Sequence, residues 1–184
     1  MNGPLEREIK LRVGSASGAR ATIVGAGGTL LRERRLQADS ILDQPDNTLS
    51  NARCALRVRV EPDRCFLTYK GQPQPSRMKL REELETGVDN PLVLFALLER
   101  LGFTVCFRYE KYREEFALGD VVVAIDETPV GTFIEIEGSD EGIIHAAATL
   151  GYDPQQFIVA SYRSLFEQQC LADGVAPGNM VFES

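Results

Sequence analysis

The sequence predicts an α+β fold in which eight antiparallel strands form the main sheet and helices cover its apolar face. Polar and apolar residues alternate along eight segments, which is the period of a half-buried strand. Several links between these segments are only a few residues long, which favours hairpins over helical crossovers. With 184 residues, 43% of them hydrophobic, the chain can bury a substantial core, and we expect a single domain over residues 1–184.

The expected strands follow one another along most of the chain. The links EPDR at 61–64 and DETPVG at 126–131 are typical of hairpin turns. Eight antiparallel strands can close into a barrel, which would turn one face of every strand toward a lumen. The strands are expected at residues 5–13, 29–42, 52–61, 64–71, 77–87, 103–114, 116–127 and 131–138.

Helices are expected in four of the remaining segments. The segment NPLVLFALLERL has the clearest end signals, because Asn90 can cap the helix, Pro91 suits its first turn and Gly102 follows its end. The helices are expected at residues 15–25, 90–101, 140–150 and 161–170.

Composition excludes several classes of function. The net charge of −7 and the isoelectric point near 4.9 argue against nucleic acid or an anionic membrane as the partner, since both require a basic surface. No apolar run approaches the roughly 18 to 20 residues of a membrane span, and the start of the chain lacks a signal region, so we expect a cytoplasmic protein. Four separated cysteines predict free thiols, without a zinc or redox motif: Cys54, Cys65, Cys106 and Cys170.

Like charges share one face on five of the expected strands. Neighbouring like charges repel, so such pairs make sense when a group of opposite charge lies between them. Acidic pairs could hold a divalent cation and basic pairs could hold phosphate oxygens. The alternative is an ordinary sheet with one solvated, charged face. The pairs are Glu6/Glu8, Arg57/Arg59, Glu83/Glu85, Lys111/Arg113 and Glu135/Glu137.

These charged residues belong to a series of motifs that spans nearly the whole chain. In chain order the motifs are E-x-E-x-K at Glu6, Glu8 and Lys10, ALRVR at 55–59, Lys70 in FLTYKG, REELE at 81–85, KYR at 111–113, VVVAIDETPVGTFIEIEG at 121–138, LGYDP at 150–154 and SYRSLF at 161–166. The series resembles the CYTH superfamily of triphosphate tunnel metalloenzymes, which includes class IV adenylyl cyclases, thiamine triphosphatases and inorganic triphosphatases. The resemblance implies an eight-stranded antiparallel β-barrel, the triphosphate tunnel, with flanking helices.

The resemblance also implies roles for individual residues. It implies Mg²⁺ or Mn²⁺ as the cofactor and a triphosphate as the substrate. The catalytic candidates are Lys10, Arg59 and Lys111. The triphosphate-binding candidates are Lys10, Arg57, Arg59, Lys70, Arg81, Lys111 and Arg113. The metal-binding candidates are Glu6, Glu8, Glu83, Glu85, Asp126, Glu135 and Glu137.

Some of these assignments keep an alternative. Glu83 and Glu85 could instead balance a neighbouring base, and Asp126 could be only a turn residue. Arg12 and Lys79 have the parity of the charged face but do not fit the core pattern of the family, so they are left outside the expected site. The stretch DSILD departs from the family pattern, because Ile41 stands where the family often has an aromatic residue.

Three functions are compatible with the motifs. The first is metal-dependent hydrolysis of tripolyphosphate or of a small organic triphosphate, such as thiamine triphosphate. The second is a class IV adenylyl cyclase that converts ATP to cyclic AMP and pyrophosphate. The third is a non-catalytic module that binds polyphosphate or a nucleotide, which the many carboxylates argue against. A homodimer is the candidate assembly.

Overall fold

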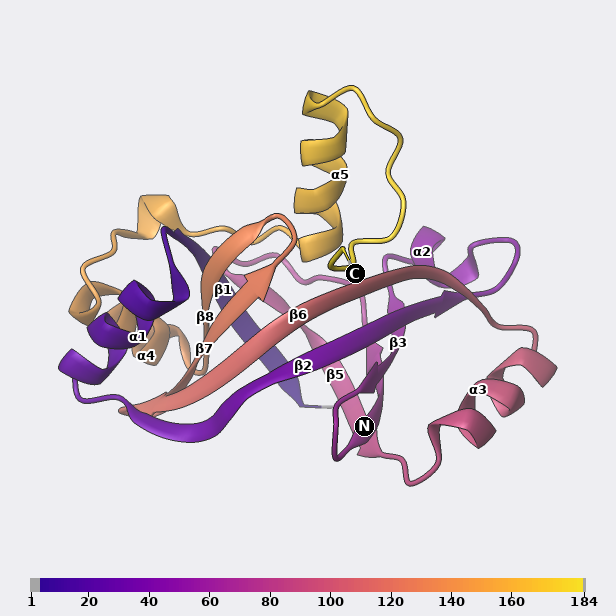
Figure 1. Ribbon diagram of the computed structural model, residues 1–184, viewed down its shortest axis with the longest axis horizontal. Helices are drawn as coiled ribbons and strands as arrows, with labels where there is room; N and C mark the ends of the chain where they lie inside the picture. Colours follow the sequence, from indigo (N-terminus) through magenta and orange to yellow (C-terminus); the bar gives the residue numbers. More distant parts are fainter. Residues whose placement is uncertain (1–3, 184) are drawn as a thin grey trace.

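Eight antiparallel strands form a closed barrel in the computed structural model, which describes residues 4–183 (Figure 1). The order around the barrel is β1-β5-β4-β3-β2-β6-β7-β8, and β8 pairs back onto β1. The α+β class and the eight-stranded antiparallel barrel are therefore confirmed. The strands are β1 (Leu5–Val13), β2 (Thr29–Asp43), β3 (Ala55–Val60), β4 (Cys65–Lys70), β5 (Lys79–Gly87), β6 (Thr104–Leu118), β7 (Val121–Thr128) and β8 (Gly131–Glu137).

Three strand boundaries differ from the expected ones by more than two residues: the end of β6, the start of β7 and the start of β3. β6 continues past residue 114 to Leu118, because Glu115 and Phe116 keep the alternation of inward and outward side chains. The turn to β7 comes at Gly119, whose φ of 62° suits a glycine. β3 starts at Ala55 rather than at residue 52, because a short helix and Arg53, with φ 58°, occupy the preceding residues.

All four expected helices are present, and each begins at a side chain that accepts a hydrogen bond from a backbone N–H: Ser15, Asn90, Ser139 and Ser161. Two helical segments were not expected, since three or four residues are too few to show a helical period. The helices are α1 (Ala16–Gly25), α2 (Thr48–Asn51), α3 (Pro91–Arg100), α4 (Asp140–Thr149) and α5 (Tyr162–Ala172), with a 3₁₀ turn at Pro154–Gln156.

Apolar side chains pack outside the barrel, under the helices. The largest core joins the outer faces of β1, β7 and β8 to α1 and α4, which lie together at one end of the barrel in Figure 1. A second core lies under α3, at the opposite end of the molecule, and a third lies at the base of α5. Ile9 and Leu11 of β1 belong to the largest core, whereas the alternating residues Glu8 and Lys10 face the lumen. The strand period thus separates an apolar exterior from a charged interior.

The segment after α4 is fastened to the barrel at two points. Lys10 and Ile158 exchange backbone hydrogen bonds of 2.9 and 2.8 Å. Met180 is fully buried and exchanges backbone hydrogen bonds with Arg108 and Glu110 of β6. α5 stands between these two points, on the rim of the barrel (Figure 1).

The four cysteines are free thiols, as the sequence predicts. Cys65 and Cys170 are buried, Cys54 is half-buried and Cys106 is exposed. Among residues 4–183, the helices are all too short or too polar to cross a membrane.

Candidate functional site: a charged tunnel

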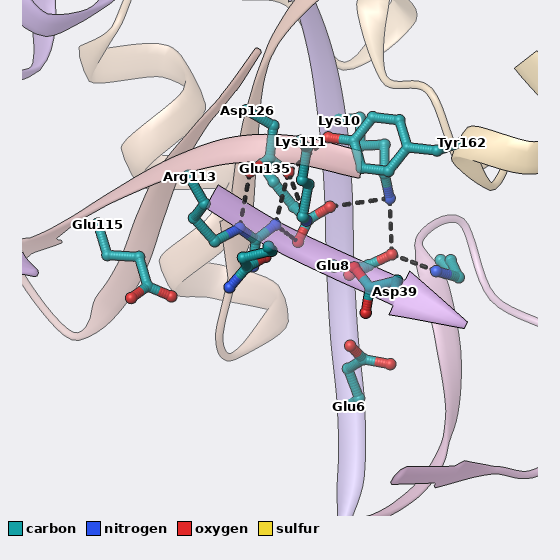
Figure 2. Close-up of polar contacts among 12 residues, drawn as sticks. Glu6, Glu8, Lys10, Asp39, Lys111, Arg113, Glu115, Asp126, Glu135 and Tyr162 are labelled. Atoms are coloured by element: carbon teal, nitrogen blue, oxygen red, sulfur yellow. Dashed lines mark hydrogen bonds and ion pairs between the residues drawn. The ribbon is translucent and has the colours of Figure 1, made fainter. Parts of the chain in front are cut away.

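One cavity of about 570 Å³ runs through the barrel and is lined by inward-facing residues from several strands. The sequence placed fourteen residues in a common site, and this cavity gathers them all except Asp126. Figure 2 shows the inner part of the cluster. The candidates that line the cavity are Glu6, Glu8, Lys10, Arg57, Arg59, Lys70, Arg81, Glu83, Glu85, Lys111, Arg113, Glu135 and Glu137.

Lys10 lies at the centre of this cluster, between two carboxylates. Its Nζ donates to Glu8 Oε1 at 2.7 Å and lies 3.1 Å from Glu135 Oε2 (Figure 2). Antiparallel pairing of β1 with β8 sets this geometry, because Lys10 is directly opposite Glu135. Burial alone would lower the pKa of Lys10, but Glu135 and Glu8 outweigh it and raise that pKa. Lys10 therefore stays charged inside the tunnel.

Asp126 lies behind the lining and holds two of the bases. Its side chain has no exposed surface and accepts from Lys111 at 2.9 Å, from Arg113 at 2.7 and 2.6 Å, and from the Tyr162 hydroxyl at 2.7 Å. Burial acts to raise the pKa of Asp126, but Arg113 and Lys111 bring it below its usual value. Both carboxylate oxygens already have donors, so these contacts favour a role in orienting Lys111 and Arg113.

Asp39 forms a similar anchor on β2, which only β6 separates from β7 in the barrel order. Its oxygens accept from Arg59 at 2.9 and 3.2 Å, and Arg57 Nε lies 3.5 Å away. β2 and β3 pair so that Asp39 faces Arg59 directly. Despite its burial, the pKa of Asp39 is lowered by Arg59 and Arg57. Two buried carboxylates, Asp39 and Asp126, thus orient guanidinium groups toward the same cavity.

The lumen also contains carboxylates with too little positive charge around them. Burial, and then repulsion from Glu8, raises the pKa of Glu6 to about 8, although Lys70 donates to it at 2.8 Å. Burial, followed by Glu135 and Glu8, raises the pKa of Glu137 to about 7. Glu137 is directly opposite Glu8 in the pairing of β8 with β1. Additional positive charge at this position would relieve the repulsion.

Hard oxygen donors of this kind fit a divalent cation of the Mg²⁺ type. Within residues 4–183 no three acidic, histidine or cysteine side chains come together closely enough to form a complete ligand set. Mg²⁺ commonly takes only one or two protein carboxylates and fills its other positions with water and phosphate oxygens. Glu6, Glu8 and Glu137 therefore fit as an incomplete ligand set that a phosphate chain would complete.

Glu83 and Glu85 both contact bases. Glu83 accepts from Lys70 at 2.5 Å, and Glu85 accepts from Thr68 at 2.8 Å and lies 3.4 Å from Arg57. These contacts favour the charge-balancing alternative over metal binding for this pair.

A polar network lies beside the cavity, between the middle of β2, the residue after β3 and β6. Arg35 donates to Glu115 at 2.5 Å and lies 3.2 Å from Glu61, which also accepts from Gln37 at 2.6 Å. Glu115 lines the cavity. The lining of the cavity also includes Ile41, Tyr109 and the first residues of α5.

The sequence of this barrel matches one family over most of its length. Residues 4–150 match the family model described as the CYTH domain. The protein belongs to the CYTH family.

Known CYTH-like proteins share both sequence and fold with this chain. A Methanocaldococcus jannaschii protein named "Putative adenylate cyclase" is 27% identical over 136 residues, which are 73% of this chain and 77% of that protein. An X-ray structure of a Vibrio parahaemolyticus "putative adenylate cyclase" has a TM-score of 0.78 at 20% identity, covering 89% of this chain and 98% of that one. A Hippeastrum protein called a "putative adenylyl cyclase", with a dominant triphosphatase activity, has a TM-score of 0.62 at 21% identity and covers 94% and 97%.

The CYTH motifs did not predict every residue of the tunnel. Lys79, which was left outside the expected site, lines the cavity and forms an ion pair with Glu8. Arg12 is outside the cavity as expected: it is exposed, and its Nη1 donates to the Val130 carbonyl. Asp39 and Tyr162 were missed. The alternation of Asp39, Ile41 and Asp43 in DSILD was a usable signal for Asp39. Tyr162 lies in the SYRSLF motif but was given no role, because it comes from a helix and strand parity could not place it in the lumen.

Proposed function

We propose that the protein is a divalent-metal-dependent enzyme that hydrolyses a small triphosphate, such as tripolyphosphate or an organic triphosphate, inside the barrel. The observation that carries this proposal is the gathering of seven candidate bases in one cavity, more positive charge than a single phosphate can use. Arg81 adds to it, because its Nε is buried and has no hydrogen-bond partner among residues 4–183. A buried donor without an acceptor is costly, and a bound phosphate oxygen would supply the acceptor.

In this mechanism the tunnel positions the phosphate chain and neutralises its charge. Arg57 and Arg59 suit bidentate contacts with phosphate oxygens, and Lys10 and Lys111 act as compact point charges. Phosphoryl transfer depends mainly on in-line positioning and charge stabilisation, which a preorganised set of bases supplies. Bound Mg²⁺ or Mn²⁺ would supply further charge neutralisation, with Glu6, Glu8 and Glu137 as its candidate ligands.

An adenylyl cyclase is the second candidate, supported by the names of the M. jannaschii and V. parahaemolyticus proteins. In that reaction the ribose 3′-hydroxyl attacks the α-phosphorus of ATP and pyrophosphate leaves. The same bases could serve either reaction, since the outcome depends on which phosphorus faces the nucleophile. The triphosphatase activity of the Hippeastrum protein supports hydrolysis as the first candidate. A purely binding role fits less well, because a site that only binds a polyanion gains nothing from the buried, mutually repelling carboxylates Glu6 and Glu137.

A panel of substrates tests the proposal and separates the two reactions. Purified protein is incubated with tripolyphosphate, ATP or thiamine triphosphate, each with Mg²⁺ and with Mn²⁺. Phosphate, pyrophosphate and cyclic AMP are measured in parallel. Phosphate release supports the hydrolase, and equal amounts of pyrophosphate and cyclic AMP from ATP would support the cyclase instead. If no triphosphate is converted under any condition, the enzymatic proposal is wrong.

Arg59→Ala is expected to weaken tripolyphosphate binding by roughly tenfold to a hundredfold, which corresponds to the loss of one charge-assisted contact. Wild-type protein should also bind tripolyphosphate far more tightly than AMP, since one phosphate cannot reach all the bases. Calorimetric titration measures both affinities. Arg64→Ala, which removes an exposed arginine from the β3–β4 hairpin, is the matched control and should bind like wild type. Equal affinities for the two ligands would contradict this assignment of the bases.

The value of kcat/KM for a triphosphate is expected to fall as the pH rises above about 8. Burial, and then the neighbouring Arg113, lowers the pKa of Lys111 to about 8, so its positive charge is lost as the pH passes that value. A pH profile of kcat/KM reports the free enzyme, in which this pKa applies. Lys111→Arg keeps the charge at high pH and should remove the fall. An unchanged alkaline fall in Lys111→Arg would assign it to another group.

A further inference from the structure

Tyr162 contacts the catalytic bases but belongs to none of the strands that carry them. It is the first residue of α5 and lies beyond residue 150, where the match to the CYTH model ends. Its side chain is only 6% exposed and lines the cavity. Its ring packs edge-on against Phe133 of β8, with the centroids 5.4 Å apart. The C-terminal segment thus inserts one aromatic side chain into the tunnel wall.

The Tyr162 hydroxyl completes the set of donors around Asp126. It donates to Asp126 Oδ2 at 2.7 Å, the same oxygen that accepts from Lys111 Nζ and Arg113 Nη2. Three donors converge on one oxygen, so removing any one of them lets the other two move. Burial, together with the charges of Asp126 and Glu135, keeps the pKa of Tyr162 well above its usual value. Tyr162 is therefore a donor over the whole working range of pH.

The Tyr162 ring also contacts both lysines of the inner cluster. Lys10 Nζ and Lys111 Nζ each lie 5.1 Å from the ring centroid (Figure 2). Cation–π contacts of this length stabilise the charged form and are stronger when water is excluded. One ring therefore holds two ammonium groups at the same distance from itself, one from β1 and one from β6.

The backbone around Tyr162 is held to the same residues. Ile158, four residues earlier, exchanges two backbone hydrogen bonds with Lys10. Met180, after α5, exchanges backbone hydrogen bonds with Arg108 and Glu110, next to Lys111. The position of Tyr162 is therefore tied to β1 and to β6, the strands that carry the two lysines.

We propose that Tyr162 is a positioning residue, which orients Lys10, Lys111 and Arg113 toward the phosphate chain. It does so through its hydrogen bond to Asp126 and through the contacts of its ring with the two lysines. This inference rests on the proposed function for its kinetic consequence, but the arrangement itself is testable without turnover. It also means that the family's strand motifs do not complete this site, because the segment after residue 150 contributes Tyr162 to it.

Two substitutions separate the hydroxyl from the ring. Tyr162→Phe keeps the ring and removes the donor, and kcat/KM for tripolyphosphate should fall about tenfold, the scale of one hydrogen bond to a charged group. Tyr162→Leu removes both and should lower kcat/KM further, by about a hundredfold. Tyr152→Phe is the matched control, because Tyr152 is also in the C-terminal segment but packs on the apolar core outside the barrel. Circular dichroism and thermal unfolding check that each variant is folded.

A double substitution distinguishes positioning from a general loss of structure. If Tyr162 acts through the Asp126 network, adding Tyr162→Phe to Lys111→Gln should lower kcat/KM by clearly less than tenfold, because one of the groups that it positions is already gone. A purely structural role would give the same tenfold factor in both backgrounds. Equal factors, or wild-type kinetics in Tyr162→Phe, would overturn the inference.

Nuclear magnetic resonance tests the arrangement without any substrate. In wild type and Tyr162→Phe, the ring should shift the Hε resonances of Lys10 and Lys111 upfield, and Tyr162→Leu should abolish that shift. Shifts that persist in Tyr162→Leu would overturn the inference. A wild-type protein that converts no triphosphate but shows shifts that depend on Tyr162 would overturn the proposed function and support the positioning by Tyr162.

Discussion

Asp126→Ala is expected to lower the free energy of unfolding by about 3 to 5 kcal/mol, the cost of leaving buried charges without their partner. Asp126 has no exposed surface and accepts hydrogen bonds from both Lys111 and Arg113. After the substitution, Arg113 keeps Glu135 at 2.5 Å, but Lys111 loses its ion-pair partner. Turnover of triphosphates should be lost as well, because Lys111 and Arg113 are no longer held in one orientation.

Denaturant unfolding measures the first effect, and single-turnover kinetics on the folded fraction measure the second. Glu127→Ala is the matched control, since Glu127 is the next residue on β7 and its ion pair with Arg34 is largely exposed. Exposed pairs contribute roughly 0 to 1 kcal/mol, so this variant should stay close to wild type. If Asp126→Ala lowers the free energy of unfolding no more than Glu127→Ala does, Asp126 does not stabilise the buried bases.

Removal of divalent metal is expected to abolish turnover, and Mg²⁺ or Mn²⁺ should restore it. The reason is the excess of carboxylates near Glu8 and Glu137, whose mutual repulsion a bound cation would relieve. Glu137→Gln should raise the metal concentration for half-maximal activity by roughly tenfold, as expected for one lost charged contact. Titration of metal into chelator-treated protein measures this value. Full turnover in excess chelator would rule out a metal-dependent mechanism.

Thermal unfolding without metal separates metal binding from misfolding in Glu137→Gln. The pKa of Glu137 is raised to about 7 in the folded state, above its value in an unfolded chain. Its protonated form is therefore favoured by folding, and the stability it contributes at low pH is lost as the pH rises through 7. Above pH 7 the glutamine variant should be at least as stable as wild type. A less stable variant would assign the kinetic effect to damage of the fold.

The sequence by itself predicted which face most of the charged strand residues occupy. Side chains alternate strictly along a strand, so the parity of Glu6, Glu8 and Lys10 was visible without any knowledge of the partner strands. Lys79 follows its parity and lines the cavity, whereas Arg12 has the same parity as Lys10 and lies outside it. Helix positions were readable for the same local reason, because capping residues such as Ser139 and Asn90 lie next to the segments they start.

Only the tertiary structure decided which charges are paired inside the tunnel. Asp126 meets Lys111 and Tyr162 across 15 and 36 residues of sequence, and Asp39 meets Arg59 across 20. Such pairs depend on the register between strands and on closure of the barrel, which no local period encodes. Tyr162 was beyond the reach of strand parity, because it enters the wall from the end of a helix whose place is set by backbone contacts on β1 and β6. The face of a strand on which a charged side chain lies is thus a local property of the sequence. The partner that neutralises the charge is decided by strand register and by closure of the barrel.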